Sequence, residues 1–215
     1  MPSFLEHREM LQLWAELPGL ERIEHGAALT FDDGPDPDAT PEVLDALDAA
    51  QIHATFFLVG EQVEAHPKLA QEIAQGGHDV QAHCFDHTHH QDVTDPAHDL
   101  WQTIEAIFKA TGVAPTMQRP PYGRFTPASH EACLQAGLEP IYWSAWGEDW
   151  EDLAPDRITD FVTRDLSDGV VILLHDSARY AHRPSARATA AAIPAIAAAM
   201  AERGLIGRPI SAARA

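Results

Sequence analysis

The feature that most constrains the fold of this chain is a regular alternation of strand-like and helix-like segments. Short apolar runs predict seven strands, separated by six segments with helical spacing. This order predicts an α/β fold with a parallel sheet and outer helices, and the even spacing favours a closed or nearly closed barrel over an open sheet. The absence of a glycine-rich phosphate loop argues against dinucleotide binding. The predicted strands are 27–32, 54–59, 79–82, 116–119, 140–144, 170–174 and 205–210, and the predicted helices are 41–50, 61–75, 96–111, 126–136, 155–167 and 186–203.

The length and composition predict a single domain. A chain of 215 residues that is 45% hydrophobic can bury one sizeable core. Residues 1–25 are predicted as a helical lead-in and residues 26–215 as the main domain. The C-terminal helix contains Pro194, which predicts a kink or a break there.

Charge and cysteine content limit the partners and the compartment. The formal net charge of -19 disfavours nucleic acid and anionic membranes as general partners. No apolar run reaches the length of a membrane span, and the N-terminus as written lacks a secretion-signal pattern. Cys84 and Cys133 are expected to be free thiols. These features favour a cytoplasmic location, and they give no prediction of the oligomeric state.

Five of the seven predicted strands end in polar or titratable groups. In a parallel barrel the functional site lies at the C-terminal ends of the strands. Chance loop polarity would seldom produce such a convergence, so it predicts an active site at this end of the barrel. The groups are Asp32 and Asp33, residues 83–87, residues 119–123, residues 148–150, and His175 with Asp176.

Asp32 and Asp33 end the first predicted strand. Side chains alternate along a strand, so both can serve one pocket only if the chain turns between them, which Gly34-Pro35 allows. The pair suggests a metal ligand and a base. The alternative is a capped turn before the next helix. A calcium loop is disfavoured because its spacing does not fit the two prolines that follow.

His83 and His87 have a spacing typical of metal ligands. With Asp33 they would form a three-ligand site with a position left open for water. The alternative is a histidine-rich surface loop, to which His89 and His90 can belong.

Two further strand ends have open interpretations. Pro120 and Pro121 lack N–H groups, so the next free donor is the Tyr122 N–H, a candidate oxyanion donor; the alternative is a structural turn. His175 ends an apolar strand and is either a general acid or a capped core residue.

In this order, TFDDGP, the HxxxH, RPPYG, the WSAWGEDW segment and LLHD closely resemble the polysaccharide deacetylases, the NodB-homology group of carbohydrate esterase family 4. The resemblance runs from about residue 27 to residue 210. It implies a distorted seven-stranded (β/α) barrel and a metal-dependent hydrolase that removes acetyl groups from N-acetylated, or O-acetylated, saccharides. Its implied site has Asp32 as general base, Arg119 as its positioning partner, His175 as general acid, Tyr122 as oxyanion donor, Asp33, His83 and His87 as zinc ligands, and Pro121 and Trp150 at the substrate.

The chain departs from the family pattern at two positions. Cys84 stands where Ser or Thr is usual, and Trp146 stands where many members carry an acid. The latter departure leaves Asp149 or Glu148 to position His175, and we expect Asp149 to do so. Trp150 is either a pocket wall or a buried core residue.

The identities of the metal and of the substrate remain open to alternatives. Cobalt or nickel can replace zinc at such a site. A deacetylase or deformylase of a small metabolite or lipid-linked sugar, and a carbohydrate-binding pseudoenzyme, are the other functions considered.

Overall fold

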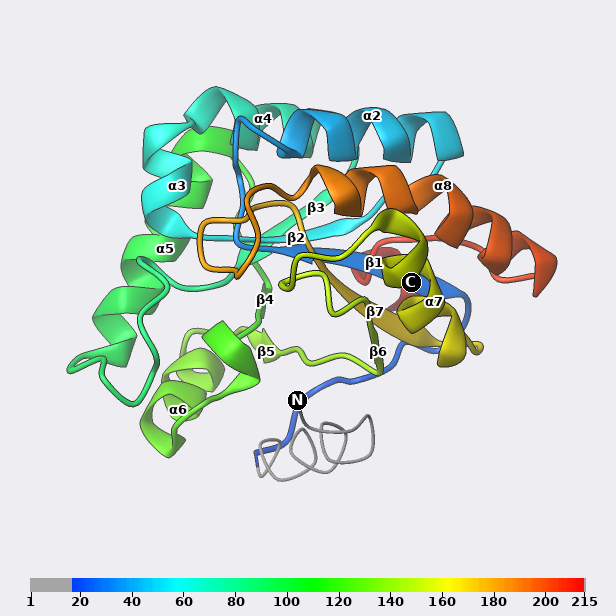
Figure 1. The fold of residues 1–215 in the computed structure, drawn as a ribbon. Coiled ribbons are helices and arrows are strands. Elements are labelled where there is room, and N and C mark those ends of the chain that lie inside the picture. Colours follow the sequence, from blue (N-terminus) through cyan, green and yellow to red (C-terminus); the bar gives the residue numbers. More distant parts are fainter. Residues whose placement is uncertain (1–16, 215) are drawn as a thin grey trace.

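The computed structural model describes residues 17–214, which contain one parallel seven-stranded sheet (Figure 1). The strand order is β5-β4-β3-β2-β1-β7-β6, and every neighbouring pair is parallel. The strands are β1 (Ala27–Asp32), β2 (Thr55–Leu58), β3 (Asp79–Ala82), β4 (Met117–Gln118), β5 (Glu139–Pro140), β6 (Ala145–Trp146) and β7 (Val170–His175).

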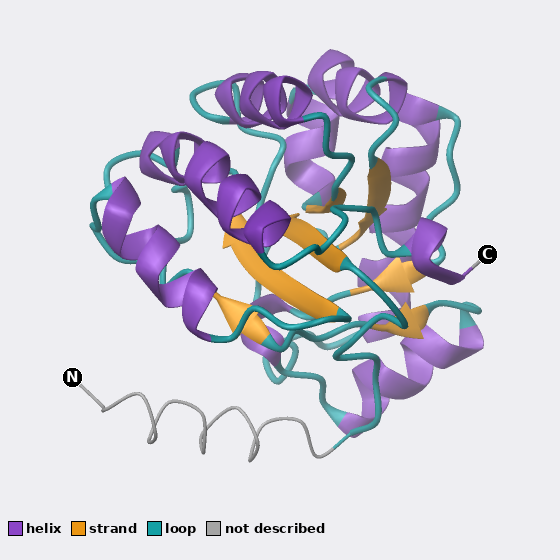
Figure 2. Cartoon of the chain, turned by 90° about the vertical axis from the view of Figure 1, so that its right-hand side faces the viewer, coloured by secondary structure: helices purple, strands orange, loops and turns teal. Residues whose placement is uncertain are grey.

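Helices cover the outside of the curled sheet (Figure 2). In Figure 1, α2 and α8 lie side by side over β1, and α7 packs against α8. Five of the helices begin with proline at their first or second position, where the missing N–H is not needed. The α-helices are α2 (Thr40–Ala50), α3 (Gly60–Ala65), α4 (Pro67–Gln75), α5 (Pro96–Thr111), α6 (Pro127–Gln135), α7 (Pro155–Arg164) and α8 (Arg187–Glu202), and the 3₁₀ turns are η1 (Pro121–Gly123) and η2 (Ser211–Arg214).

The two faces of β1 belong to two different parts of the core. Leu29 and Phe31 join the large cluster between sheet and helices, whereas Ala28 belongs to a smaller cluster inside the barrel. Asp32 shares the inner face with Ala28 because side chains alternate along a strand. The Asp32 carboxylate therefore lies on the inner face of the barrel, at the C-terminal end of a fully buried strand.

The sheet is a distorted barrel, as the family resemblance implies, and it is open between β5 and β6, the two ends of the strand order. Residues 20–22 cross this side, because Leu20 bridges to Ile141 and Arg22 bridges to Val170. The α/β fold class and the single-domain architecture are thus confirmed.

Two predicted elements of the sheet are wrong. The predicted strand 205–210 forms only an isolated bridge, between Gly207 and Ala27. β7 pairs along the whole of β1, and β2 occupies the other edge at residues 30–32, so residues 205–210 find only a short free edge, at Ala27. The sheet still has seven strands because β6, which was not predicted, takes the place of the segment 205–210. The predicted strand 140–144 is shortened to β5.

Several helix boundaries also differ. The predicted helix 61–75 is two helices that meet at His66, because a residue before proline disfavours the α conformation. Pro194 was predicted to cause a kink or a break, and α8 continues through it, so no break occurs. The predicted lead-in helix falls mainly on residues 1–16, outside the described residues, and residues 17–25 contain bridges and bends in place of helix. Within residues 17–214, no helix has the length and apolar character that crossing a bilayer requires.

Candidate active site

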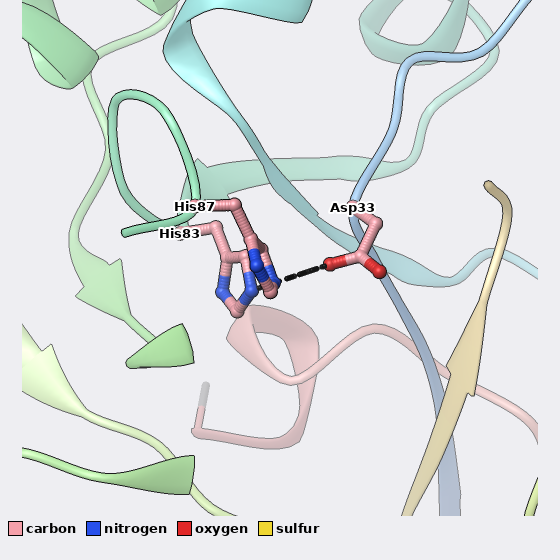
Figure 3. A group of neighbouring side chains, drawn as sticks. All are labelled: Asp33, His83 and His87. Carbon is pink, nitrogen blue, oxygen red and sulfur yellow. Dashed lines mark ion pairs between the residues drawn. The ribbon is translucent and has the colours of Figure 1, made fainter. Parts of the chain in front are cut away.

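Three predicted ligands come together at the C-terminal ends of β1 and β3. Asp33, His83 and His87 each offer one atom, and these atoms lie within 4.8 Å of one another. All three side chains are buried, and Figure 3 shows them pointing toward one another. The Nε2 of His87 lies 3.0 Å from Asp33 Oδ1, and that of His83 lies 3.5 Å from the same oxygen. Burial would raise the pKa of Asp33, but the two imidazoles and His175 hold this pKa well below its usual range.

The donor atoms of this group fit a divalent cation. Nδ1 of His83 lies 2.8 Å from the Arg119 carbonyl oxygen and donates its hydrogen to it. A neutral His83 therefore presents a lone pair on Nε2 toward Asp33. Asp33 Oδ1 accepts no hydrogen bond from residues 17–214, despite its burial. Two imidazole nitrogens and a carboxylate oxygen thus converge on one space, and mixed imidazole and carboxylate ligation suits zinc and similar ions.

The backbone at this group is turned into unusual conformations. Asp33 has φ 81° and His87 has φ 61°, a region that residues with a Cβ rarely adopt. The turn at Asp33 lets two adjacent carboxylates serve one pocket, as the DDGP pattern predicted. The next residue must be glycine, because a Cβ on Gly34 would collide with the Asp176 carboxylate.

Asp32 is paired with a fully buried arginine. Nη1 of Arg119 donates to Asp32 Oδ1 at 2.8 Å and to Thr30 Oγ1 at 2.7 Å, and Nη2 donates to the Tyr142 carbonyl oxygen at 2.9 Å. The guanidinium also lies 4.3 Å from the centre of the Phe57 ring. Burial lowers the pKa of Arg119, and Asp32 opposes that shift. The orientation of Asp32 is therefore fixed from inside the barrel.

His175 is paired with Asp149, as predicted, and not with Glu148. Its Nδ1 lies 2.8 Å from Asp149 Oδ1, and its backbone N–H donates to Asp149 Oδ2 at 2.9 Å. Burial lowers the pKa of His175, but Asp149, with smaller effects from Asp33 and Asp32, outweighs burial and raises this pKa to about 9. Asp149 therefore favours the protonated form of the imidazole.

The paired carboxylate and imidazole open on the same pocket as the three ligands. Asp32 and His175 are register partners on β1 and β7, so their side chains lie next to each other at the strand ends. The pocket has a volume of about 360 Å³. It is lined by Asp32, Asp33, His83, His87, Tyr122, Gly123, Trp143, Trp150, Leu173, His175, Tyr180, Ala181 and His182.

The remaining predicted residues lie as follows. Tyr122 and Trp150 line the pocket, and Tyr122 has φ 56° in the turn after β4. Pro121 is buried and is not among the lining residues, and its contact with substrate stays a prediction. Cys84 is a buried free thiol whose pKa burial raises. Trp146 is a buried β6 residue that pairs in register with Leu173.

Sequence reasoning missed one wall of the pocket. Tyr180, Ala181 and His182 line it from the segment 176–186, which follows β7. Trp143 lines it as well. The segment 176–186 has no apolar periodicity that places its side chains, and its aromatic and histidine residues directly after a polar strand end were the available signal.

Residues 21–141, more than half of the chain, match the sequence profile of the polysaccharide deacetylase family. The chain belongs to this family.

Other polysaccharide deacetylases align over most of the chain. The chain is 37% identical over 151 residues to the peptidoglycan-N-acetylglucosamine deacetylase PgdA of Listeria monocytogenes, which covers 69% of this chain and 32% of the relative. The chain thus spans about a third of the length of the first curated relatives it matches. It is 36% identical to the chitooligosaccharide deacetylase of Bradyrhizobium sp., with 69% of each chain covered.

A solved polysaccharide deacetylase has the same fold. The Bc1960 peptidoglycan N-acetylglucosamine deacetylase superposes with a TM-score of 0.82 at 28% identity, covering 90% of this chain and 89% of the other.

Proposed function

We propose that this protein is a metal-dependent deacetylase that hydrolyses the acetamido group of N-acetylated sugars in glycans. The observation that supports this proposal most is that three groups meet at one pocket. They are the candidate metal ligands Asp33, His83 and His87, the Asp32–Arg119 pair, and the His175–Asp149 pair. The names of the related peptidoglycan and chitooligosaccharide deacetylases support the choice of an N-acetylated sugar.

The chemistry is transfer of an acetyl group from nitrogen to water. A divalent cation held by the three ligands would supply Lewis acidity that polarises the acetyl carbonyl and lowers the pKa of water. Asp32 accepts a proton from the attacking water as a C–O bond forms at the acetyl carbon. His175 donates a proton to the sugar nitrogen as the C–N bond breaks, which leaves acetate and a free amine.

Two pairs of residues prepare this proton transfer. Arg119 holds Asp32 in place through the charge-assisted hydrogen bond from Nη1 to Oδ1. Asp149 keeps His175 protonated, as a general acid must be. The Tyr122 N–H is the proposed additional donor to the oxyanion that develops on the acetyl oxygen.

Zinc is the proposed physiological metal, with cobalt or nickel as functional replacements. Two imidazoles and one carboxylate with an open position are the ligand set of many catalytic zinc sites. This choice rests on ligand chemistry, and metal analysis of the purified protein tests it.

The direct test of the proposed function is acetate release from a panel of substrates. The panel contains chitooligosaccharides, peptidoglycan fragments, O-acetylated glycans and single N-acetylated or N-formylated amino sugars. We expect release from N-acetylated oligosaccharides, its loss after chelation, and its return with added zinc. Binding of the oligosaccharides without any acetate release in the zinc-loaded protein would instead indicate a carbohydrate-binding protein.

Substitution of either imidazole ligand is expected to weaken metal binding. His83→Ala and His87→Ala each remove one of three protein ligands. The one carboxylate and one imidazole that remain bind a divalent ion weakly. We expect metal content and acetate release to fall together, and elemental analysis after dialysis measures the first. His98→Ala, a change at an exposed histidine of α5 outside the pocket, is the control. One metal per chain in both ligand variants would refute the assignment.

A further inference from the structure

The two histidines of the metal group are held in different ways. His83 has its ring fixed by the hydrogen bond from Nδ1 to the Arg119 carbonyl oxygen. The Nδ1 of His87 is buried and has no hydrogen-bond partner among residues 17–214. Histidine ligands of metals usually donate their second ring N–H to an acceptor, which sets the orientation of the ring. The orientation of His87 must therefore have another origin.

The His87 ring is instead packed between two tyrosines. The ring of Tyr180 is stacked on it, with a centroid distance of 4.1 Å and an angle of 6° between the planes. The ring of Tyr122 meets it edge-on at 4.7 Å and 73°. Rotation of the imidazole about its Cβ–Cγ bond would tilt the ring into Tyr180, so the stack restricts this rotation.

Tyr180 is itself fixed at its hydroxyl. This group donates to Glu61 Oε1 at 2.8 Å, and the Gln62 side-chain amide donates to the same oxygen at 2.9 Å. Tyr180 lies in the segment 176–186, and His182 of the same segment donates its backbone N–H to the Trp150 carbonyl oxygen at 2.8 Å. The ring is thus held on both sides, by the N-terminus of α3 and by the loop after β6.

We propose that Tyr180 is a positioning residue for the metal ligand His87. The stack fixes the ring orientation of His87, as the hydrogen bond from Nδ1 fixes that of His83. In this orientation Nε2 of His87 points toward Asp33. The stack also strengthens when a cation is bound, because the imidazole then becomes more positive and the phenol ring attracts positive charge on its face. This inference rests on the proposed function, since it requires a metal at Asp33, His83 and His87.

The test compares the metal affinity of variants that keep or lose the aromatic ring. Tyr180→Phe keeps the stack and loses the hydroxyl, whereas Tyr180→Leu loses both. We expect Tyr180→Leu to raise the dissociation constant for zinc by roughly tenfold or more, the range for partners of metal-bound histidine. Tyr180→Phe is expected to stay within about threefold of the wild type, since it retains the ring. Competition with a chromophoric chelator measures these constants without turnover.

A second readout reports the geometry of the site. The visible absorption of the cobalt-substituted protein depends on the arrangement of the ligands. We therefore expect this spectrum to change in Tyr180→Leu and to match that of the wild type in Tyr180→Phe. Arg179→Leu is the matched control, because Arg179 is the exposed neighbour in the same segment and loss of its positive charge does not weaken cation binding.

The outcomes separate this inference from the proposed function. Unchanged zinc affinity and an unchanged cobalt spectrum in Tyr180→Leu would overturn the role of Tyr180 and leave the metal site standing. Equal losses in Tyr180→Phe and Tyr180→Leu, or a loss in Arg179→Leu, would also overturn it, because the ring would then not be what matters. A wild-type protein that binds no divalent ion would overturn the proposed metal site and this inference with it.

Discussion

Asp32→Asn is expected to abolish most of the acetate release while leaving the metal in place. An amide of the same shape cannot accept a proton from water, and removal of a general base costs roughly a hundredfold or more in turnover. Asp32 does not belong to the group formed by Asp33, His83 and His87, so metal content should stay near that of the wild type. Turnover under saturating substrate and elemental analysis of the same preparation measure the two quantities.

The same substitution is expected to lower the thermal stability. It leaves the guanidinium of Arg119, which is 0% exposed, without its carboxylate partner. Thr30 and the Tyr142 carbonyl oxygen still accept hydrogen bonds from Arg119, but neither carries a compensating charge. Breaking a buried ion pair by removing one charge is strongly destabilising, so assays belong well below the melting temperature of the variant.

Asp33→Asn is the matched comparison, because it makes the same chemical change at the adjacent residue. This variant is expected to lose metal and activity together, since Asp33 supplies the carboxylate of the ligand group. Loss of the metal in Asp32→Asn with retention in Asp33→Asn would mean that the two roles are reversed.

The positions of the candidate residues were predictable where a strand end fixes them. Asp32 lies on β1 and His175 on β7, and both strands have long apolar runs with clear ends. Parallel pairing then brings the two residues into register, which is why separate motifs could be assigned to one pocket. The bounds of β1, β3 and α5 were also predicted in full, and α5 is marked by Pro96 at its start and by Gly112 after its end.

Prediction failed where pairing in space decides the structure. β6 has only two residues, and nothing in WSAWG distinguishes it from the preceding turn. The segment 205–210 has a strand-like composition, but β7 and β2 leave it only a short edge of β1, at Ala27. The strand pattern of a segment cannot show whether a free edge exists for it.

The wall formed by residues 176–186 shows a second limit. Its positions are set by hydrogen bonds to distant residues, such as that from Tyr180 to Glu61 and that from the His182 N–H to Trp150. Arg183 of this segment lies 3.5 Å from Asp149 and donates to the His175 carbonyl oxygen at 3.1 Å. Such contacts follow from the folded arrangement and leave no periodic pattern in the sequence.

Asp149 has donors on both of its oxygens, which makes its charge hard to replace. Oδ1 accepts from the His175 ring, whereas Oδ2 accepts from the His175 backbone N–H and from Thr189 Oγ1 at 2.7 Å. An asparagine has only one oxygen, so either orientation of its amide would point an NH₂ group at a donor. The variant therefore loses the negative charge and at least one of these hydrogen bonds.

Asp149→Asn is accordingly expected to lower the maximal rate and to shift the pH dependence of the reaction. The pKa of His175 is about 9 with Asp149 present, and loss of this carboxylate favours the neutral imidazole, so the pKa falls. A general acid must be protonated to act, and the high-pH limb of the rate profile therefore moves to lower pH. A cation in the metal group would lower the His175 pKa in both proteins, so the comparison between them retains its sign. Rate profiles from pH 5 to 11 measure the shift.

Two variants show whether the charge of Asp149 is responsible. Thr189→Val removes one donor from Oδ2 but keeps the carboxylate, so its high-pH limb should stay in place even if the protein is less stable. Glu148→Gln removes the neighbouring charge, which makes no hydrogen bond to His175, and should also leave the limb unshifted. A limb that does not move in Asp149→Asn would show that Asp149 only holds the segment 176–186 through Arg183. The same shift in Glu148→Gln would transfer the electrostatic role to Glu148, because only a charge that acts on the imidazole changes its pKa.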